Sequence, residues 1–300
     1  MLKLTLWGTR GSTPVSGPAF QRYGGATTCL ELVPLNGSPN TPSRLLIDCG
    51  SGLGNLARRT SDPFDDTVVL QTHFHWDHIQ GFPLFSPLFS PTSHLRLFGV
   101  RRDGKSLRDV LTSQMARPLF PVQLSDLPAT LEFEDLAESG RLRMGDLEIQ
   151  WTELCHPSGS TGYRITCGEA TVAFSGDTEV QMDRRRELVD LARGADLLIM
   201  DAQYFPDDYP SRRGFGHSTP LDAVEVARQA GVRRLLLTHH DPAHDDDALD
   251  RKLALARNAA GEDLEVDNGR DGLGVQIGGC EKPALIWPRG IATDEMEMAQ

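Results

Sequence analysis

Cysteine is scarce in this chain, and long apolar runs are missing from it. The 300 residues include five cysteines, which stand far apart and form no CxxC pair. The sequence therefore predicts neither a disulfide framework nor a cysteine-ligated zinc site. No apolar run approaches the ~20 residues that a membrane-spanning helix needs, and residues 1–7 predict a strand rather than a signal peptide. We expect a soluble, cytoplasmic protein that does not enter a membrane.

Positive charge is also in short supply. The 30 lysines and arginines are outnumbered by 42 aspartates and glutamates, for a formal net charge of −12. Such a balance disfavours non-specific binding to nucleic acid. It leaves room for a local basic patch at residues 184–186 or 212–213, although runs of this kind also serve as plain solvated surface.

Linkers, repeats and nucleotide-binding loops are missing as well. No low-complexity segment divides the chain, so we predict a single domain over residues 1–288 and a loosely attached polar tail over 289–300. With 39% hydrophobic residues, the chain can bury a sizeable core. The glycine loops at 8–14 and 23–28 match neither a Rossmann nor a Walker pattern.

Apolar patterning predicts strands early in the chain and alternating strands and helices later, which suits sheets covered by helices. Predicted strands are 2–7, 29–33, 45–48, 67–70, 95–100, 146–154, 161–166, 171–175, 196–200 and 233–238, and predicted helices are 106–115, 184–193, 219–230 and 245–259. Between residues 81 and 153 no motif assigns a function. The apolar segment 82–85 could line a pocket or the interface of a homodimer, but we expect it in the core.

The densest chemistry lies in residues 72–78, Thr-His-Phe-His-Trp-Asp-His. In extended backbone, residues two apart point the same way, so His73 and His75 can face one point. A turn into a helix would bring Asp77 and His78 to a second point close by. Imidazole nitrogens and carboxylate oxygens suit zinc, and also manganese or iron. We interpret this stretch as a metal motif rather than a histidine-rich loop without metal.

This HxHxDH pattern resembles the metallo-β-lactamase superfamily. The resemblance implies an α/β (α+β) fold, a four-layer αββα sandwich with a metal centre at one edge between its two sheets. It also implies two divalent metal ions, with Zn²⁺ expected and Mn²⁺ as the alternative.

Later histidines and aspartates match the superfamily's remaining ligands in chain order. The implied ligands of the first metal are His73, His75 and His156, those of the second are Asp77, His78 and His239, and Asp177 bridges the two. Because His240 adjoins His239, strand alternation would turn only one of them inward, and the resemblance favours His239. Asp48 is not a ligand in this scheme; it either orients a ligand or shapes a turn.

Residues 216–219, Gly-His-Ser-Thr, resemble an element of the ribonuclease Z and cyclic-nucleotide phosphodiesterase branch. There the histidine contacts the scissile phosphate and assists the leaving group, which would be the role of His217. The same residues also suit an ordinary helix start, with Ser218 or Thr219 as N-cap and Pro220 in the first turn. Both can hold, because a helix N-terminus is itself a phosphate site.

We therefore predict a metal-dependent phosphodiesterase, in which a bridging hydroxide attacks a small phosphodiester of the cyclic-nucleotide or cyclic-phosphate type. Asp77 would orient the hydroxide, and His217 would protonate the leaving oxygen. Ribonuclease Z commonly carries a long tRNA-binding arm between the positions matched by His156 and Asp177. Residues 157–176 leave no room for it, so tRNA is the less expected substrate. The alternatives are RNA processing of the ribonuclease Z kind, hydrolysis of a thioester or lactone, and a metal-bound sensor or scaffold.

Overall fold

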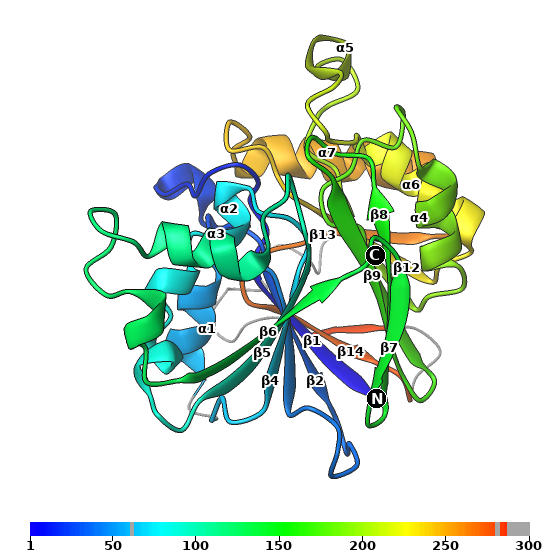
Figure 1. The fold of residues 1–300 in the computed structure, drawn as a ribbon. Coiled ribbons are helices and arrows are strands. Elements are labelled where there is room, and N and C mark those ends of the chain that lie inside the picture. Colours follow the sequence, from blue (N-terminus) through cyan, green and yellow to red (C-terminus); the bar gives the residue numbers. More distant parts are fainter. Residues whose placement is uncertain (61–62, 280–282, 287–300) are drawn as a thin grey trace.

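Two β-sheets face each other at the centre of the computed structural model, which describes residues 1–60, 63–279 and 283–286 (Figure 1). Within these residues the first sheet has the strand order β15-β14-β1-β2-β3-β4-β5-β6, and the second has the order β13-β12-β11-β10-β9-β8-β7. The first comprises β1 (Leu2–Gly8), β2 (Cys29–Pro34), β3 (Arg44–Ile47), β4 (Thr67–Gln71), β5 (His94–Val100), β6 (Thr130–Leu136), β14 (Leu273–Ile277) and β15 (Ala284–Ile286). The second comprises β7 (Gly140–Met144), β8 (Leu147–Leu154), β9 (Ser160–Cys167), β10 (Ala170–Phe174), β11 (Leu197–Asp201), β12 (Arg234–Thr238) and β13 (Glu265–Asn268).

Helices cover the outer face of each sheet, which completes four layers (Figure 1). The helices are α1 (Leu53–Arg59), α2 (Trp76–Ile79), α3 (Leu107–Gln114), α4 (Arg185–Ala192), α5 (Tyr209–Arg212), α6 (Pro220–Ala230) and α7 (Asp246–Ala260), with short 3₁₀ turns η1 (Pro18–Phe20), η2 (Phe82–Leu84), η3 (Ser86–Phe89) and η4 (Leu124–Asp126). The apolar residues form three buried clusters, one between the sheets and one under each helical layer. The predicted αββα sandwich is confirmed.

The parallel strands decide where polar residues gather. Strands β3 to β6 run parallel to one another, as do β10 to β13. Because the carboxyl ends of parallel strands meet at one edge, the residues that follow them share that edge. Asp48 follows β3, Thr72 follows β4, Asp201 ends β11 and His239 follows β12.

Two contacts tie the sheets together beside this edge. The Thr161 peptide N–H at the start of β9 donates to the Thr72 carbonyl at 3.0 Å. The fully buried Tyr163, also on β9, donates its hydroxyl proton to the Gln71 carbonyl of β4 at 2.7 Å. The strand-end residues of one sheet are thereby held against those of the other.

The predicted helices and strands agree with these elements to within one or two residues at most ends, but five strands were not predicted. Strand β6 carries Glu132, Glu134 and Asp135 and alternates between exposed and half-buried positions, because it lies at the edge of its sheet. Strands β7, β13 and β15 also lie at sheet edges, and β14 pairs with β15. Charged side chains protect an edge strand from pairing with other chains. In the sequence they also obscure the alternation of apolar and polar residues that would indicate a strand.

Other expectations have mixed outcomes. In the apolar segment 82–85, Phe82 and Phe85 are buried as expected, whereas Leu84 is 74% exposed. Cys29, Cys49 and Cys167 are buried free thiols, while Cys280 and the predicted tail 289–300 lie outside the described residues. Of the helices in the described part of the chain, none has the length and apolar character needed to cross a membrane.

The inter-sheet bond of Tyr163 leads to a stability prediction. Replacing Tyr163 with phenylalanine keeps the packing volume but removes the donor to the buried Gln71 carbonyl. We expect the free energy of unfolding to fall by about 1–2 kcal/mol, the usual cost of losing such a bond. Urea denaturation followed by circular dichroism measures it, and an unchanged midpoint would contradict the role given to this bond.

Candidate metal centre

The predicted metal-binding residues lie together at the shared edge of the two sheets. One group of potential ligand atoms comes from His73, His75 and His156, and a second comes from Asp77, His78, Asp177 and His239. Within each group the atoms lie within 4.8 Å of one another. Asp177 belongs to the second group, and its Oδ2 atom is also 3.6 Å from Nε2 of His73 in the first. The carboxylate thus stands between the two groups.

The two groups take their positions from a short helix that follows β4. Strand β4 ends at Gln71, His73 and His75 lie in the extended backbone beyond it, and α2 begins at Trp76. The start of this helix turns Asp77 and His78 toward the second group, as the spacing predicted. Asp77 is held there by the Ser12 peptide N–H, which donates to its Oδ2 atom at 2.7 Å.

Several imidazoles in the cluster are held from behind by an acceptor on Nδ1. Nδ1 of His78 lies 2.7 Å from Oδ2 of the fully buried Asp48. Nδ1 of His156 lies 2.8 Å from the Gly216 carbonyl. Such partners fix the ring orientation of metal-bound histidines and direct the other nitrogen toward the ion. Of the two roles open to Asp48, orienting a histidine is therefore the one that the contacts support.

The donor atoms that face inward suit a divalent metal. Nε2 of His78 and Nε2 of His239 each lie 3.1 Å from Oδ2 of Asp177. Nε2 of His73 is buried and has no hydrogen-bond partner among the described residues, a costly state that an ion would relieve. Imidazole nitrogen and carboxylate oxygen are the donors that zinc takes in hydrolytic sites. The residues present therefore fit a divalent metal centre.

Electrostatic effects within the cluster keep its carboxylates ionised. Burial raises the pKa of the Asp177 carboxyl, but the imidazoles of His239 and His78 outweigh this effect, and the net pKa lies well below the usual range. The pKa of Asp77 is lowered in the same way, with His78 as the largest influence against burial. Burial lowers the pKa of the His156 imidazole to about 3. Burial works against a charged His239 or His78, but Asp177 outweighs it, so the pKa of His239 is raised to about 10 and that of His78 lies above its usual range. Metals require ionised carboxylates and neutral imidazoles, so an ion that binds here would displace protons from these two rings.

The structure separates the adjacent histidines at the end of β12. His239 adopts φ = 55°, in the left-handed region, directly after the strand ends at Thr238. Its ring enters the cluster, with Nδ1 3.0 Å from Oε1 of Gln203, whereas Nε2 of His240 lies 2.9 Å from the Gly269 carbonyl, away from the cluster. Gly11 permits this arrangement, because a Cβ atom there would lie 2.4 Å from the His239 ring. Strand alternation alone could not have decided between them.

His217 lies beside both groups and is held by a residue that the sequence analysis missed. Nδ1 of His217 is 2.8 Å from Oδ2 of Asp201, the last residue of β11. The carboxylate of Asp201 also accepts the Thr178 peptide N–H at 3.1 Å, so it is itself fixed. Its place in the sequence could have indicated a role in the site, because Asp201 ends a buried strand and Asp177 likewise follows one. The residue types alone gave no reason to pair it with His217.

The helix-start interpretation of Gly-His-Ser-Thr is confirmed. Thr219 is the N-cap of α6, its side chain accepting the Asp222 N–H in a reciprocal capping box, and Pro220 occupies the first turn. His217 precedes the cap by two residues. The start of α6 therefore fixes the chain directly after His217.

A second missed residue, Glu179, fixes the backbone just before His217. Its side chain is 2% exposed, and its carboxylate accepts the peptide N–H groups of Gly214 and Gly216 and the hydroxyl of Tyr209, each at 2.8 Å. Gly216 has φ = 92°, and a Cβ atom there would lie 2.2 Å from Nδ1 of His156. Only glycine allows the carbonyl of residue 216 to approach His156 in this way.

The αββα layers and the histidine–aspartate cluster between the sheet edges define a hydrolase of the metallo-β-lactamase type. The chain belongs to this superfamily: the family model described as "Beta-lactamase superfamily domain" matches residues 43–240. A ribonuclease Z of Brevibacillus brevis is 41% identical over 251 residues, which cover 67% of this chain and 77% of that protein. The predicted superfamily and its ribonuclease Z branch are confirmed.

Solved structures support the same fold. The metallo-β-lactamase fold protein YhfI from Bacillus subtilis superposes with a TM-score of 0.68 at 23% identity, covering 91% of this chain and 98% of that one. The short form of human tRNase Z superposes with a TM-score of 0.64 at 21% identity, covering 92% and 99%.

The contacts of Glu179 lead to a prediction about local stability. In Glu179→Gln a neutral amide replaces the charged acceptor of the Gly214 and Gly216 N–H groups. Because bonds to charged groups contribute about 1.5–3 kcal/mol and neutral ones about half that, we expect both amides to exchange with solvent about tenfold faster. Hydrogen exchange measures this, with Glu169→Gln, exposed in the β9–β10 turn, as control. Unchanged exchange at both glycines would show that other contacts hold the segment.

Proposed function

We propose that this hydrolase cleaves small phosphodiesters with two divalent metal ions, zinc or manganese. The observation that supports this proposal most directly is the position of His217. Its ring belongs to two groups of possible ligand atoms, one with His156 and Asp177 and the other with Asp201 and His239. A further imidazole beside both sets of donors, yet not needed to complete either, suits a residue that contacts substrate.

The proposed ligands are those that the resemblance implies. They are His73, His75 and His156 for one ion and Asp77, His78 and His239 for the other, with Asp177 shared. When bound, the two ions would supply a nucleophilic water at neutral pH and positive charge that attracts a phosphoryl group.

The protein's own residues would orient the water and assist the leaving group. The Ser12 N–H fixes one oxygen of Asp77, so the carboxylate can hold a water in a single orientation. Asp201 fixes the His217 ring through Nδ1 and leaves Nε2 available. A proton on Nε2 can pass to the leaving oxygen of the ester, and Asp201 stabilises the imidazolium that carries it.

The short connections around His156 support a small substrate. Strand β8 ends at Leu154 and β9 begins at Ser160, and β9 turns into β10 through Gly168 and Glu169. No arm for a folded RNA leaves the fold between His156 and Asp177. RNA processing remains the second candidate, because the Brevibacillus brevis relative is a ribonuclease Z.

A substrate panel tests the proposed reaction. Protein stripped of metal and reloaded with zinc or manganese is assayed on bis(p-nitrophenyl) phosphate, a thioester, a β-lactam and a precursor tRNA with a 3′ trailer. We expect cleavage of the phosphodiester only, with activity lost on chelation and restored by metal. Turnover of the thioester or β-lactam without the phosphodiester would refute the proposal, and accurate trailer removal would favour the second candidate.

Matched substitutions separate metal ligands from the residues that serve the leaving group. In His217→Asn and Asp201→Asn we expect kcat to fall roughly 10²- to 10⁴-fold, the usual range for a general acid, while metal content stays at the wild-type level. In His73→Asn we expect metal content itself to fall, because a ligand is lost. Metal analysis beside kinetics measures both, with His94→Asn, whose imidazole contacts Glu132 away from the cluster, as control. Equal metal loss in His217→Asn would remove it from the leaving-group role.

A further inference from the structure

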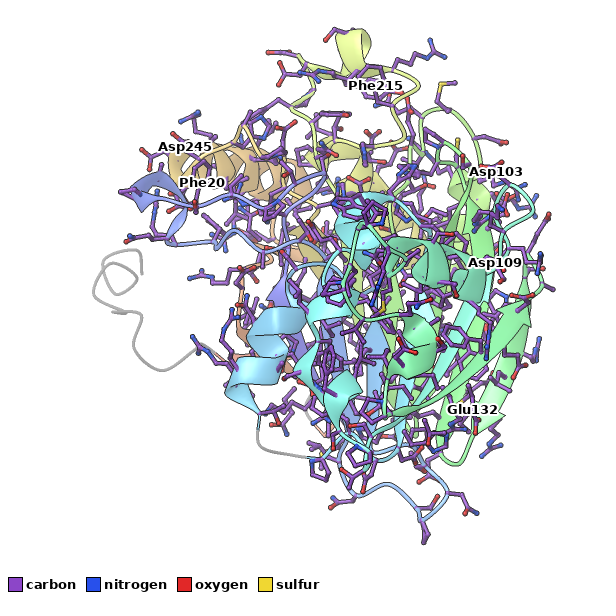
Figure 2. All side chains as sticks on the ribbon, turned by 60° about the vertical axis from the view of Figure 1, so that its left-hand side comes forward. Phe20, Asp103, Asp109, Glu132, Phe215 and Asp245 are labelled. Atoms are coloured by element: carbon purple, nitrogen blue, oxygen red, sulfur yellow. The ribbon has the colours of Figure 1, made fainter. Side chains whose placement is uncertain are left out.

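An exposed phenyl ring is mounted rigidly beside the candidate metal centre. Phe215 is 56% exposed. The peptide N–H groups on both sides of it, those of Gly214 and Gly216, donate to the buried Glu179 carboxylate. Figure 2 shows Phe215 on the segment that projects beyond the body of the fold. A phenyl ring this exposed adds little to the core, and its backbone is held in place. Both observations indicate a role at the surface.

A second exposed ring lies inside the metal motif itself. Trp76 separates His75 from Asp77, and it is 60% exposed, although tryptophan is usually well buried. Its backbone is the first turn of α2, where the Trp76 carbonyl accepts the Gln80 N–H at 2.9 Å. Helix α2 therefore fixes the backbone of Trp76, as the Glu179 carboxylate fixes the backbone around Phe215.

Hydrogen bonds connect the backbones that carry the two rings. Nδ1 of His75, the neighbour of Trp76, lies 3.0 Å from Nε2 of His156. Nδ1 of the His156 imidazole lies 2.8 Å from the carbonyl of Gly216, the neighbour of Phe215. One histidine, His156, thus bridges the chain neighbours of Trp76 and Phe215, and His75 beside it is exposed to solvent.

Two arginines lie close to Phe215 in the sequence. Arg212 and Arg213 precede Phe215 and are exposed. The Arg212 guanidinium lies over the Tyr204 ring at 5.8 Å, and that ring meets His217 edge-on at 5.6 Å. Positive charge therefore lies close to His217, although the chain as a whole is acidic.

We propose that Trp76 and Phe215 form a binding site for the nucleobase of a nucleoside phosphodiester, whose phosphate reaches His217. This inference rests on the proposed function and narrows its substrate class. Bases of every kind stack on aromatic rings, and cations beside such rings follow the phosphate, which is the combination present here. A substrate without a base would leave both rings in water and would bind less tightly.

A pair of esters with one leaving group tests the site. Metal-loaded protein is assayed on the p-nitrophenyl ester of thymidine 5′-phosphate and on methyl p-nitrophenyl phosphate, which lacks the nucleoside. We expect kcat/KM to favour the nucleoside ester, and this preference to fall about tenfold in Phe215→Ala and in Trp76→Ala, within the range measured for loss of one stacking ring. Phe215→Tyr keeps a ring and should restore the preference. An unchanged preference in both alanine variants would overturn the proposal.

Phe89→Ala is the matched control. Phe89 is 45% exposed and lies in η3, which contacts α1. We expect the wild-type preference in this variant. A loss equal to that in Phe215→Ala would mean that exposed rings act non-specifically, and it would count against the site.

Binding separates this inference from the proposed reaction. Calorimetry on the metal-loaded protein compares adenosine 5′-monophosphate with ribose 5-phosphate, which differ by the base. Tighter binding of the nucleotide, lost in Phe215→Ala, supports the site even if neither ester is cleaved, in which case only the proposed reaction fails. Equal affinity of the two ligands for the wild-type protein overturns the site whether or not phosphodiesters are hydrolysed.

Discussion

Buried imidazoles at the sheet edge depend on fixed acceptors behind them. Asp48, Gln203 and the Gly216 carbonyl each receive the outer nitrogen of one histidine, and Asp201 does the same for His217. Without these partners the rings could rotate, and the inner nitrogens would not converge. The acceptors come from both sheets and from loops far apart in the chain, so the cluster exists only when the whole sandwich is assembled.

This arrangement carries a cost in stability. Asp177 and His78 are almost fully removed from water, and a buried charge is unfavourable unless it is paired. Glycines add a further constraint, because Gly11 and Gly216 let backbone approach the rings of His239 and His156 more closely than any Cβ atom would allow. Binding of metal to the folded state alone would offset part of this cost, since a ligand that prefers the native state stabilises it. Local instability accepted for a preorganised site is common at functional centres.

Two segments beside the cluster differ in how far they extend from the fold. The connection after His156 is short, whereas the segment before His217 projects outward around α5 (Figure 1). Glu179 joins that segment to the strand ends, so its position is coupled to the orientation of His156. The projecting segment is thereby attached directly to a residue that would hold metal, and a change in one affects the geometry of the other.

The sequence by itself determined the kind of chemistry. Spacing within residues 72–78 placed His73, His75, Asp77 and His78 next to a strand end, because periodicity is a local property of the backbone. It also predicted most strands and helices, since apolar alternation survives wherever one face is buried. Partners brought from distant parts of the chain were decided only by the tertiary structure. Asp201 beside His217, Glu179 behind Phe215, and His239 rather than its neighbour all depend on strand order and on one left-handed residue, which no local pattern encodes.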